Sequence, residues 1–218
     1  MAVLSIRIIG DPVLRTPSAE VTNFGPELAR LVSDMMETMD DVHGAGLAAP
    51  QVGVSLRVFT FRIDDVSGYV VNPVLEVKAE DENETQAEAQ AETQNENRDE
   101  ELEGCLSIPG LGYPLQRAGW ARVTGVDIHG AAIAYEGTGM LARCFQHETD
   151  HLNGSLYIER LDGEHRKAAM RAIRSSAYST VADQTTRDRS QSLGSSFGLG
   201  VSAARPTTGS RQSGTRRA

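Results

Sequence analysis

The chain has only two cysteines and no long run of apolar residues. Both features exclude classes of protein. Two cysteines cannot build a disulfide framework, and in a reducing compartment we expect Cys105 and Cys144 to remain thiols. No stretch approaches the ~20 apolar residues that span a bilayer. Residues 1–9 lack the basic and long apolar regions of a signal peptide, and they predict an opening strand. We therefore expect a cytoplasmic protein without a membrane partner.

Negative charge is confined to one segment of the chain. The net charge is −9, but residues 80–103 hold eleven acidic side chains against one arginine, which leaves the rest of the chain near +1. The acidity is local, so it does not indicate which partners the folded body prefers.

The length of 218 residues predicts one domain of ordinary size. We expect a single catalytic domain over residues 1–178, interrupted by an acidic insertion at 79–102. The insertion is rich in Glu, Gln, Asn and Ala and cannot bury enough apolar surface to order itself, although these residue types also allow a weak helix. Ser, Thr, Gly and Arg dominate residues 179–218, which predicts a disordered tail.

Hydrophobic periodicity predicts an α+β fold. Apolar residues recur every three or four positions over 26–42, so this helix should pack one face on the core, and Gly44 should supply its left-handed cap. Strands are expected at 56–62 and 69–77, and a hairpin joins 118–128 to 131–135. Helices are expected at 138–153 and 164–178. We therefore expect antiparallel sheets around a central metal-binding helix, with one N-terminal and one C-terminal helix.

Residues 147–151, His-Glu-Thr-Asp-His, are the most informative stretch. Histidines at i and i+4 project from one helix face and can bind a single metal ion. Glu148 can reach a water on that metal without being a ligand, so it is a candidate general base. Several hydrolase families share this pattern.

A third ligand is available upstream, in the sequence Glu-Gly-Cys-Leu-Ser at 103–107. Three protein ligands leave a fourth position for water, which is typical of a catalytic site. Cys144 competes with Cys105, but it lies seven residues from His151, about 10 Å along a straight helix. We therefore favour Cys105 as the ligand and expect Cys144 to be a small apolar residue beside it.

Residues 44–51, Gly-Ala-Gly-Leu-Ala-Ala-Pro-Gln, form the second element of the site. Small residues let another backbone lie close alongside, as an extended substrate requires. The segment lacks the Lys-Ser/Thr ending of a phosphate-binding loop. Gln51 offers an amide donor for an oxyanion. A tight turn after a helix is the plain alternative.

These three segments, in this order, resemble the peptide deformylase family. The resemblance includes the sequence Ile-Ile-Gly-Asp-Pro-Val-Leu-Arg at 8–15 and covers about residues 3–175, without the insertion and the tail. An insertion at this place is similar to what actinobacterial, and thus bacterial, members carry.

The resemblance implies a hydrolase of protein biosynthesis that removes the formyl group from the N-terminal formyl-methionine of nascent peptides and releases formate. The metal that the resemblance implies is iron(II), with zinc, nickel or cobalt as substitutes. Glu148 would accept a proton from the attacking water and pass it to the leaving amine. Gln51 and the backbone N–H of Leu106 would stabilise the oxyanion. The implied metal ligands are Cys105, His147 and His151.

The substrate pocket is the least constrained part of this interpretation. Side chains near the ligands could line an apolar pocket for methionine, or they could simply be core. The candidates are Ala45, Gly46, Leu47, Met140 and Cys144. Arg117 resembles a family position near the peptide-binding cleft. Asp150 and Arg143 are candidates for outer supports of the site or for a surface pair.

Two other classes of protein compete with this interpretation. A zinc peptidase would place a third histidine where Tyr157 stands, or would use a glutamate such as Glu164, and neither version explains residues 103–107. A closed structural zinc module of Cys105, Cys144 and the two histidines would have no use for Glu148.

The expected partners follow from the same segments. The C-terminal helix carries four basic side chains that could contact ribosomal RNA phosphates, although a charged helix is more often simply solvated. They are Arg166, Lys167, Arg171 and Arg174. We expect a monomer that binds no DNA.

Overall fold

The computed structural model describes residues 2–78 and 102–195. The predictions for 79–101 and 196–218 lie outside these residues. A five-stranded antiparallel sheet has the order β1-β2-β3-β6-β7, and β4 and β5 form a separate two-stranded hairpin. The strand bounds are β1 Gly46–Ala48, β2 Val58–Ile63, β3 Val66–Lys78, β4 Leu102–Cys105, β5 Ile108–Pro114, β6 Trp120–Val126 and β7 Ala132–Thr138.

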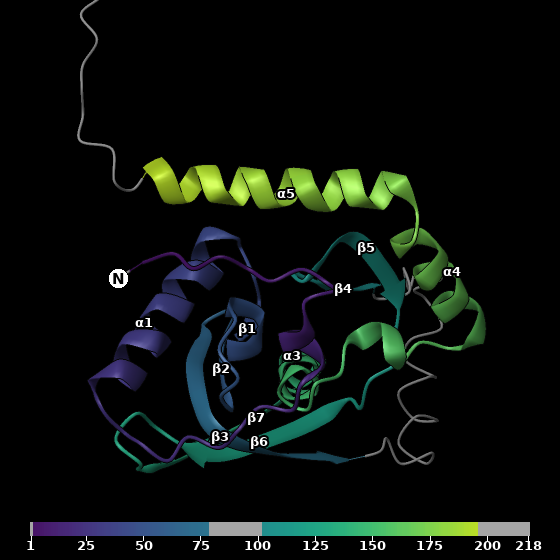
Figure 1. Ribbon diagram of the computed structural model, residues 1–218. Helices are drawn as coiled ribbons and strands as arrows, with labels where there is room; N and C mark the ends of the chain where they lie inside the picture. Colours follow the sequence, from purple (N-terminus) through teal and green to yellow (C-terminus); the bar gives the residue numbers. More distant parts are fainter. Residues whose placement is uncertain (1, 79–101, 196–218) are drawn as a thin grey trace, which may run out of the picture.

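The helix α3 lies between the sheet and the hairpin (Figure 1). The predicted α+β arrangement of antiparallel sheets around this central helix is confirmed. The α-helices are α1 Pro26–Asp41, α3 Gly139–Leu152, α4 Gly163–Ile173 and α5 Ser176–Ser195. Within residues 2–78 and 102–195, three short 3-10 turns accompany them: η1 Pro12–Arg15, η2 Ala49–Val52 and η3 Tyr157–Glu159. In the described part of the chain, no helix has the length and apolarity that a membrane crossing requires.

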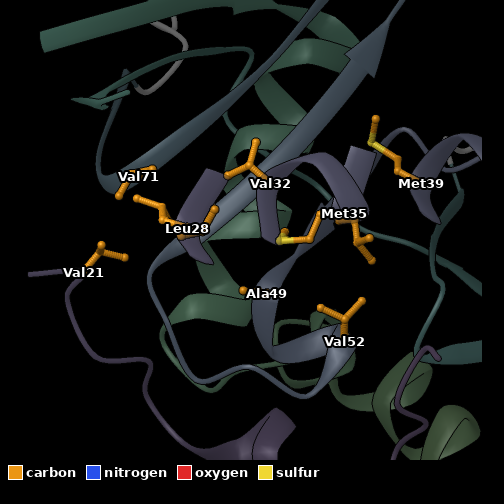
Figure 2. Close-up of a cluster of buried hydrophobic side chains, with 10 residues drawn as sticks. Val21, Leu28, Val32, Met35, Met39, Ala49, Val52 and Val71 are labelled. Carbon is orange, nitrogen blue, oxygen red and sulfur yellow. The ribbon is translucent and has the colours of Figure 1, made fainter. Parts of the chain in front are cut away.

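The helix α1 packs its apolar stripe on the sheet, as its periodicity predicts. Met35 and Met39 are fully buried, and Leu28 and Val32 continue the same face (Figure 2). Pro26 begins the helix, where a missing N–H costs nothing. The left-handed residue after the helix is His43, with φ of 52°, and not the expected Gly44. Gly44 instead lies in a tight place, because a Cβ there would be 3.0 Å from Leu106 Cδ1.

Aromatic side chains hold α3 against the sheet. Phe145 on α3 meets Phe61 on β2 edge-to-face, with ring centroids 5.1 Å apart, and Phe59 lies 6.2 Å from Phe145. All three are fully buried. Edge-to-face pairs add about 0.5–1.5 kcal/mol beyond the burial of their area. This cluster therefore fixes where α3, and every side chain that α3 carries, sits over the sheet.

The N-terminal segment is not the strand that its apolar residues predict. Residues 2–7 belong to no strand. Instead, the Arg7 N–H donates to Gln51 O at 2.7 Å and the Ile9 N–H to Ser107 O at 2.8 Å. The segment runs between η2 and the β4–β5 turn and bonds once to each, so no ladder of paired residues forms.

The C-terminal region also differs from the prediction of one helix at 164–178 followed by a disordered tail. The first helix ends at Ile173, and α5 follows it and extends to Ser195. The side-chain oxygen of Ser175 accepts the Tyr178 N–H at 3.2 Å and so starts the second helix. Tyr178 and Ala182, one helical turn apart, are buried in the cluster around Ile108. The abundance of Ser and Thr hides this apolar pair in the sequence.

Two further predictions concern the start of β4 and the hairpin between β6 and β7. Leu102, which the predicted insertion includes, is the first residue of β4. The hairpin between β6 and β7 is confirmed, and its turn is closed by Asp127, whose carboxylate accepts the N–H groups of His129 and Ala131.

Replacing Phe145 with alanine should lower the free energy of unfolding by about 3–5 kcal/mol, because the cavity opens beneath α3 in a closed aromatic cluster. Denaturant unfolding monitored by circular dichroism measures this change. The control is Phe24→Ala, at a residue that is 39% exposed, which should change stability by less than about 0.5 kcal/mol. Equal effects of the two substitutions would contradict this account of the core.

Candidate metal centre

Three potential metal ligands meet beside α3. The spacing of four residues places His147 and His151 on one face of the helix, with ring centroids 4.9 Å apart. Cys105 Sγ, from the end of β4, lies 3.3 Å from His151 Nε2. One ligand atom from each of the three residues lies within 4.8 Å of the other two. Helix and hairpin thus bring together residues more than forty positions apart in the sequence.

The sulfur of Cys105 is surrounded by N–H groups. The backbone N–H of Ser107 points at Sγ at 3.4 Å, and Gln51 Nε2 lies 3.7 Å from it. Two N–H groups thus point at the atom that would bind a metal as a thiolate. The tight turn between β4 and β5 produces the Ser107 contact, and η2 presents Gln51.

Cys144 occupies a different place from Cys105. Both are free cysteines, so no disulfide joins them. The Cys144 side chain is buried, with its Sγ 3.6 Å from Ala45 O. It packs on Gly46, where an added Cβ would lie 2.8 Å from Cys144 Sγ and would also clash with the Glu148 carboxylate. Gly46 is therefore required by the close approach of β1 to α3.

The carboxylate of Glu148 is buried next to the ligands. Its residue is 3% exposed, and among the described residues its Oε2 has no hydrogen-bond partner. Burial raises the pKa of Glu148 to about 7. A carboxyl group with a pKa near neutrality can both accept and return a proton, which is what a general base that later acts as an acid needs.

Glu103 is the partner that orients His147, a role that reasoning from the sequence missed. Its Oε1 lies 2.7 Å from His147 Nδ1, so the Nε2 of that ring remains for a metal. Arg117 also donates two hydrogen bonds to this carboxylate, at 2.6 and 3.0 Å. Burial alone would raise the pKa of Glu103, but the hydrogen bonds from His147 and Arg117 outweigh it and lower this pKa to about 2. The signal in the sequence that could have found Glu103 is the alternation of side chains along a strand, which places Glu103 and Cys105 on one face of β4.

Arg117 is not the cleft residue that the sequence interpretation expected. Its side chain is 5% exposed and bridges Glu103 and Asp150, with its Nη1 2.7 Å from Asp150 Oδ2. It lies behind the ligands and is absent from the lining of the cleft. Asp150 also accepts bonds from Arg160, and Arg143 bonds to Glu103 at 3.1 Å. Asp150 and Arg143 thus support the site through Arg117 and Glu103 and do not form a surface pair.

A cleft of about 670 Å³ opens over Cys105 and His147, and His151 lies buried behind them. Ala45, Gly46 and Met140 line it, as the pocket prediction expects, and Gln51 and Leu106 line it as well. Leu47 and Cys144 do not, because both are turned into the core. Lining residues that the sequence analysis did not single out include Leu102, Thr185 and Arg189.

The donor set fits a transition metal. Imidazole nitrogen and thiolate sulfur are preferred by zinc, iron, nickel and cobalt over magnesium or calcium. Three protein ligands, of which Cys105 and His147 line the cleft, leave room for a further ligand on the cleft side. The arrangement therefore defines a metal-dependent hydrolase site, with a buried carboxylate beside the ligands.

Comparison with known proteins identifies the family. The model of the family described as "Polypeptide deformylase" matches residues 3–167. A peptide deformylase from Acidothermus cellulolyticus is 50% identical over 187 residues, 86% of this chain and 93% of that protein. One from Parafrankia is 48% identical over 82% of this chain and 90% of its own length.

Solved structures agree with the sequence relatives. A peptide deformylase from Legionella pneumophila superposes with a TM-score of 0.67 at 32% identity, covering 87% of this chain and 99% of that one. A peptide deformylase from Synechococcus elongatus, in complex with actinonin, superposes with a TM-score of 0.65 at 32% identity, covering 80% of this chain and 88% of that one. The chain belongs to the polypeptide deformylase family and is a metalloenzyme of that type.

Replacing Glu103 with glutamine should weaken metal binding about 10–100-fold, because His147 loses the charged partner that orients it. Competition with a chromophoric chelator measures the dissociation constant. The control is Glu136→Gln on β7, where the exposed carboxylate contacts only the surface side chain of Arg122 among the described ion pairs. An unchanged dissociation constant in Glu103→Gln would show that His147 needs no such partner.

Proposed function

We propose that this enzyme removes the formyl group from the N-terminal formyl-methionine of newly synthesised polypeptides, with Glu148 as general base and Cys105, His147 and His151 as metal ligands. The observation that carries the proposal is the buried carboxylate of Glu148, next in sequence to the ligand His147, behind a cleft that Cys105 and His147 line. A structural metal site would have no use for such a carboxylate.

The proton transfers belong to Glu148. When bound, the metal supplies Lewis acidity and makes water a nucleophile near neutral pH. Glu148 takes a proton from the water that attacks the formyl carbon, and the C–N bond then breaks. The same carboxyl group passes the proton to the departing amine, and formate leaves with the oxygen from water. The burial that raises the pKa of Glu148 supports both transfers.

Gln51 and the Leu106 N–H are the proposed donors to the developing oxyanion. The Gln51 side chain is held in place because its Oε1 accepts the Ala48 N–H at 2.8 Å. Its Nε2 therefore faces Cys105 and Ser107, on the side of the ligands. Donors that are fixed before the reaction cost no reorganisation when charge develops.

The peptide is proposed to enter along the edge strand β1. This strand lies at one edge of the five-stranded sheet, and Ala45 and Gly46 line the cleft there. An extended peptide can add to a sheet edge through main-chain hydrogen bonds. Met140 and Leu102, both exposed at the cleft, offer apolar surface for the methionine side chain.

Iron(II) is the proposed native metal, with zinc, nickel or cobalt as substitutes. The thiolate of Cys105 would donate more electron density than a third imidazole, so the site is softer than a three-histidine site. A soft site of this kind makes the choice of metal important for the reaction. We also propose that the enzyme works in the cytoplasm, where nascent chains are available.

Replacing Glu148 with glutamine should lower the rate of formate release from an N-formyl-methionyl tripeptide by at least about 100-fold, since proton transfer by a positioned group contributes about 100–10,000-fold. The assay uses anaerobic, iron- or nickel-loaded protein. Metal content, measured in the same samples, should stay at one equivalent. Absence of formate from the metal-loaded parent would refute the proposed reaction itself.

A ribosome contact is proposed for α4 and its junction with α5. Lys167, Arg171 and Arg174 line a groove there together with Met170 and Ser175. Lysine and arginine side chains bind RNA phosphates and release counterions, so the contact should weaken as salt increases. The basic side chains on one small surface are what support this proposal.

Reversing two charges, with Arg171→Glu and Arg174→Glu together, should abolish cosedimentation with ribosomes at low salt and leave formate release unchanged. The matched control is Arg187→Glu on α5, combined with Arg122→Glu on β6, which changes the net charge equally at exposed positions. Parent protein that fails to cosediment at low salt, or binding that survives the double reversal, would exclude this contact.

A further inference from the structure

The helix α5 is docked on the hairpin that carries Cys105. It runs alongside β5 (Figure 1) and lies beyond residue 167, where the match to the family model ends. Tyr178 and Ala182 are buried against this part of the fold. Gly110 on β5 has φ of 75°, and a Cβ there would lie 3.0 Å from Val181 Cγ1. Backbone and helix are thus in close contact.

One face of α5 leads from this docking surface to the cleft. Tyr178, Ala182, Thr185 and Arg189 are spaced by four, three and four residues, so they share one side of the helix. The first two are buried, and the last two line the cleft. The position of Arg189 at the cleft is therefore set by the packing of the helix two and three turns earlier.

The guanidinium of Arg189 contacts the turn between β4 and β5. Its Nη1 donates to Leu106 O at 3.0 Å. The peptide group that contains this oxygen continues into the N–H of Ser107, which points at Cys105 Sγ at 3.4 Å. One peptide group therefore connects the cation on α5 to the sulfur of the proposed ligand.

A peptide group transmits polarisation between its two ends. A charged donor on the oxygen draws electron density from the amide and makes its N–H a stronger donor. The stronger N–H in turn stabilises negative charge on the sulfur that accepts it. Outer partners of this kind orient metal ligands and alter how strongly they donate to the metal.

We infer that Arg189 is a positioning residue of the metal centre: through the Leu106–Ser107 peptide group it holds the Cys105 sulfur in place and restrains its electron donation to the metal. This inference rests on the proposed metal ligands. Burial lowers the pKa of Arg189, and the nearby Cys105 sulfur opposes that shift. Loss of Arg189 leaves the sulfur more electron-rich and the metal a weaker Lewis acid.

The experiment uses the full chain loaded with cobalt(II), whose thiolate charge-transfer band reports the energy of the sulfur lone pairs. We expect Arg189→Gln to move this band to longer wavelength, because a less stabilised sulfur gives up an electron more easily. Arg189→Lys keeps the positive charge, so its band should lie close to the wavelength of the parent band. The control Arg187→Gln, at an exposed position on the same helix, should match the parent.

Kinetics of the same variants separate an effect at the metal from an effect on peptide binding. We expect kcat for formate release to fall about tenfold in Arg189→Gln, with KM unchanged, in the range that loss of an outer partner produces. Helix content from circular dichroism should equal that of the parent, since Tyr178 and Ala182 still dock α5.

The outcomes distinguish this inference from the proposals on which it rests. A cobalt form of the parent without a thiolate band would refute Cys105 as a ligand. A parent that shows the band but releases no formate would refute the proposed reaction alone. If the band is normal in the parent and unchanged in folded Arg189→Gln, or moves equally in Arg187→Gln, the role of Arg189 is refuted.

Discussion

The hydrogen bond between Glu103 and His147 is the interaction on which the organisation of the site depends. It joins the hairpin that carries Cys105 to the helix that carries both histidines. Arg117 stabilises the same carboxylate and reaches on to Asp150, which α3 also carries. The buried charges alternate in sign, and each satisfies its neighbour, as buried ionic groups must. Removing Glu103 would take away the partner that Arg117, Arg143 and His147 share.

Two further sets of contacts hold the elements of the site in position. The aromatic cluster of Phe59, Phe61 and Phe145 sets the position of α3 over the sheet. The N-terminal segment then ties the two turns near the ligands together, because Arg7 bonds to Gln51 and Ile9 bonds to Ser107. The chemistry proposed for this site needs groups fixed before the substrate arrives, and both devices provide this.

The sequence predicted best where a short-range pattern carries the information. The spacing of the two histidines and the apolar stripe with Met35 and Met39 depend only on helix geometry, and both appear in the structure as expected. Arg117 could not be placed in this way, because its partners lie 14 and 33 residues distant and only the tertiary fold brings them together. The same holds for Leu47 and Cys144, where sequence proximity to the ligands suggested the cleft but the direction of the side chains leads into the core. The helical part of 179–195 was missed because its polar composition outweighed a single apolar pair.

The wall of the cleft that α5 contributes has a consequence for selective inhibition. Thr185 and Arg189 line the cleft, yet they lie outside the 3–167 stretch that the family model describes. A compound that binds only the metal and the floor would meet groups within that stretch. A compound extended to hydrogen-bond Thr185 or to place an anion near Arg189 would gain contacts from α5 as well. Discrimination between this enzyme and relatives with a different C-terminal helix would therefore depend on how far the compound reaches from the metal.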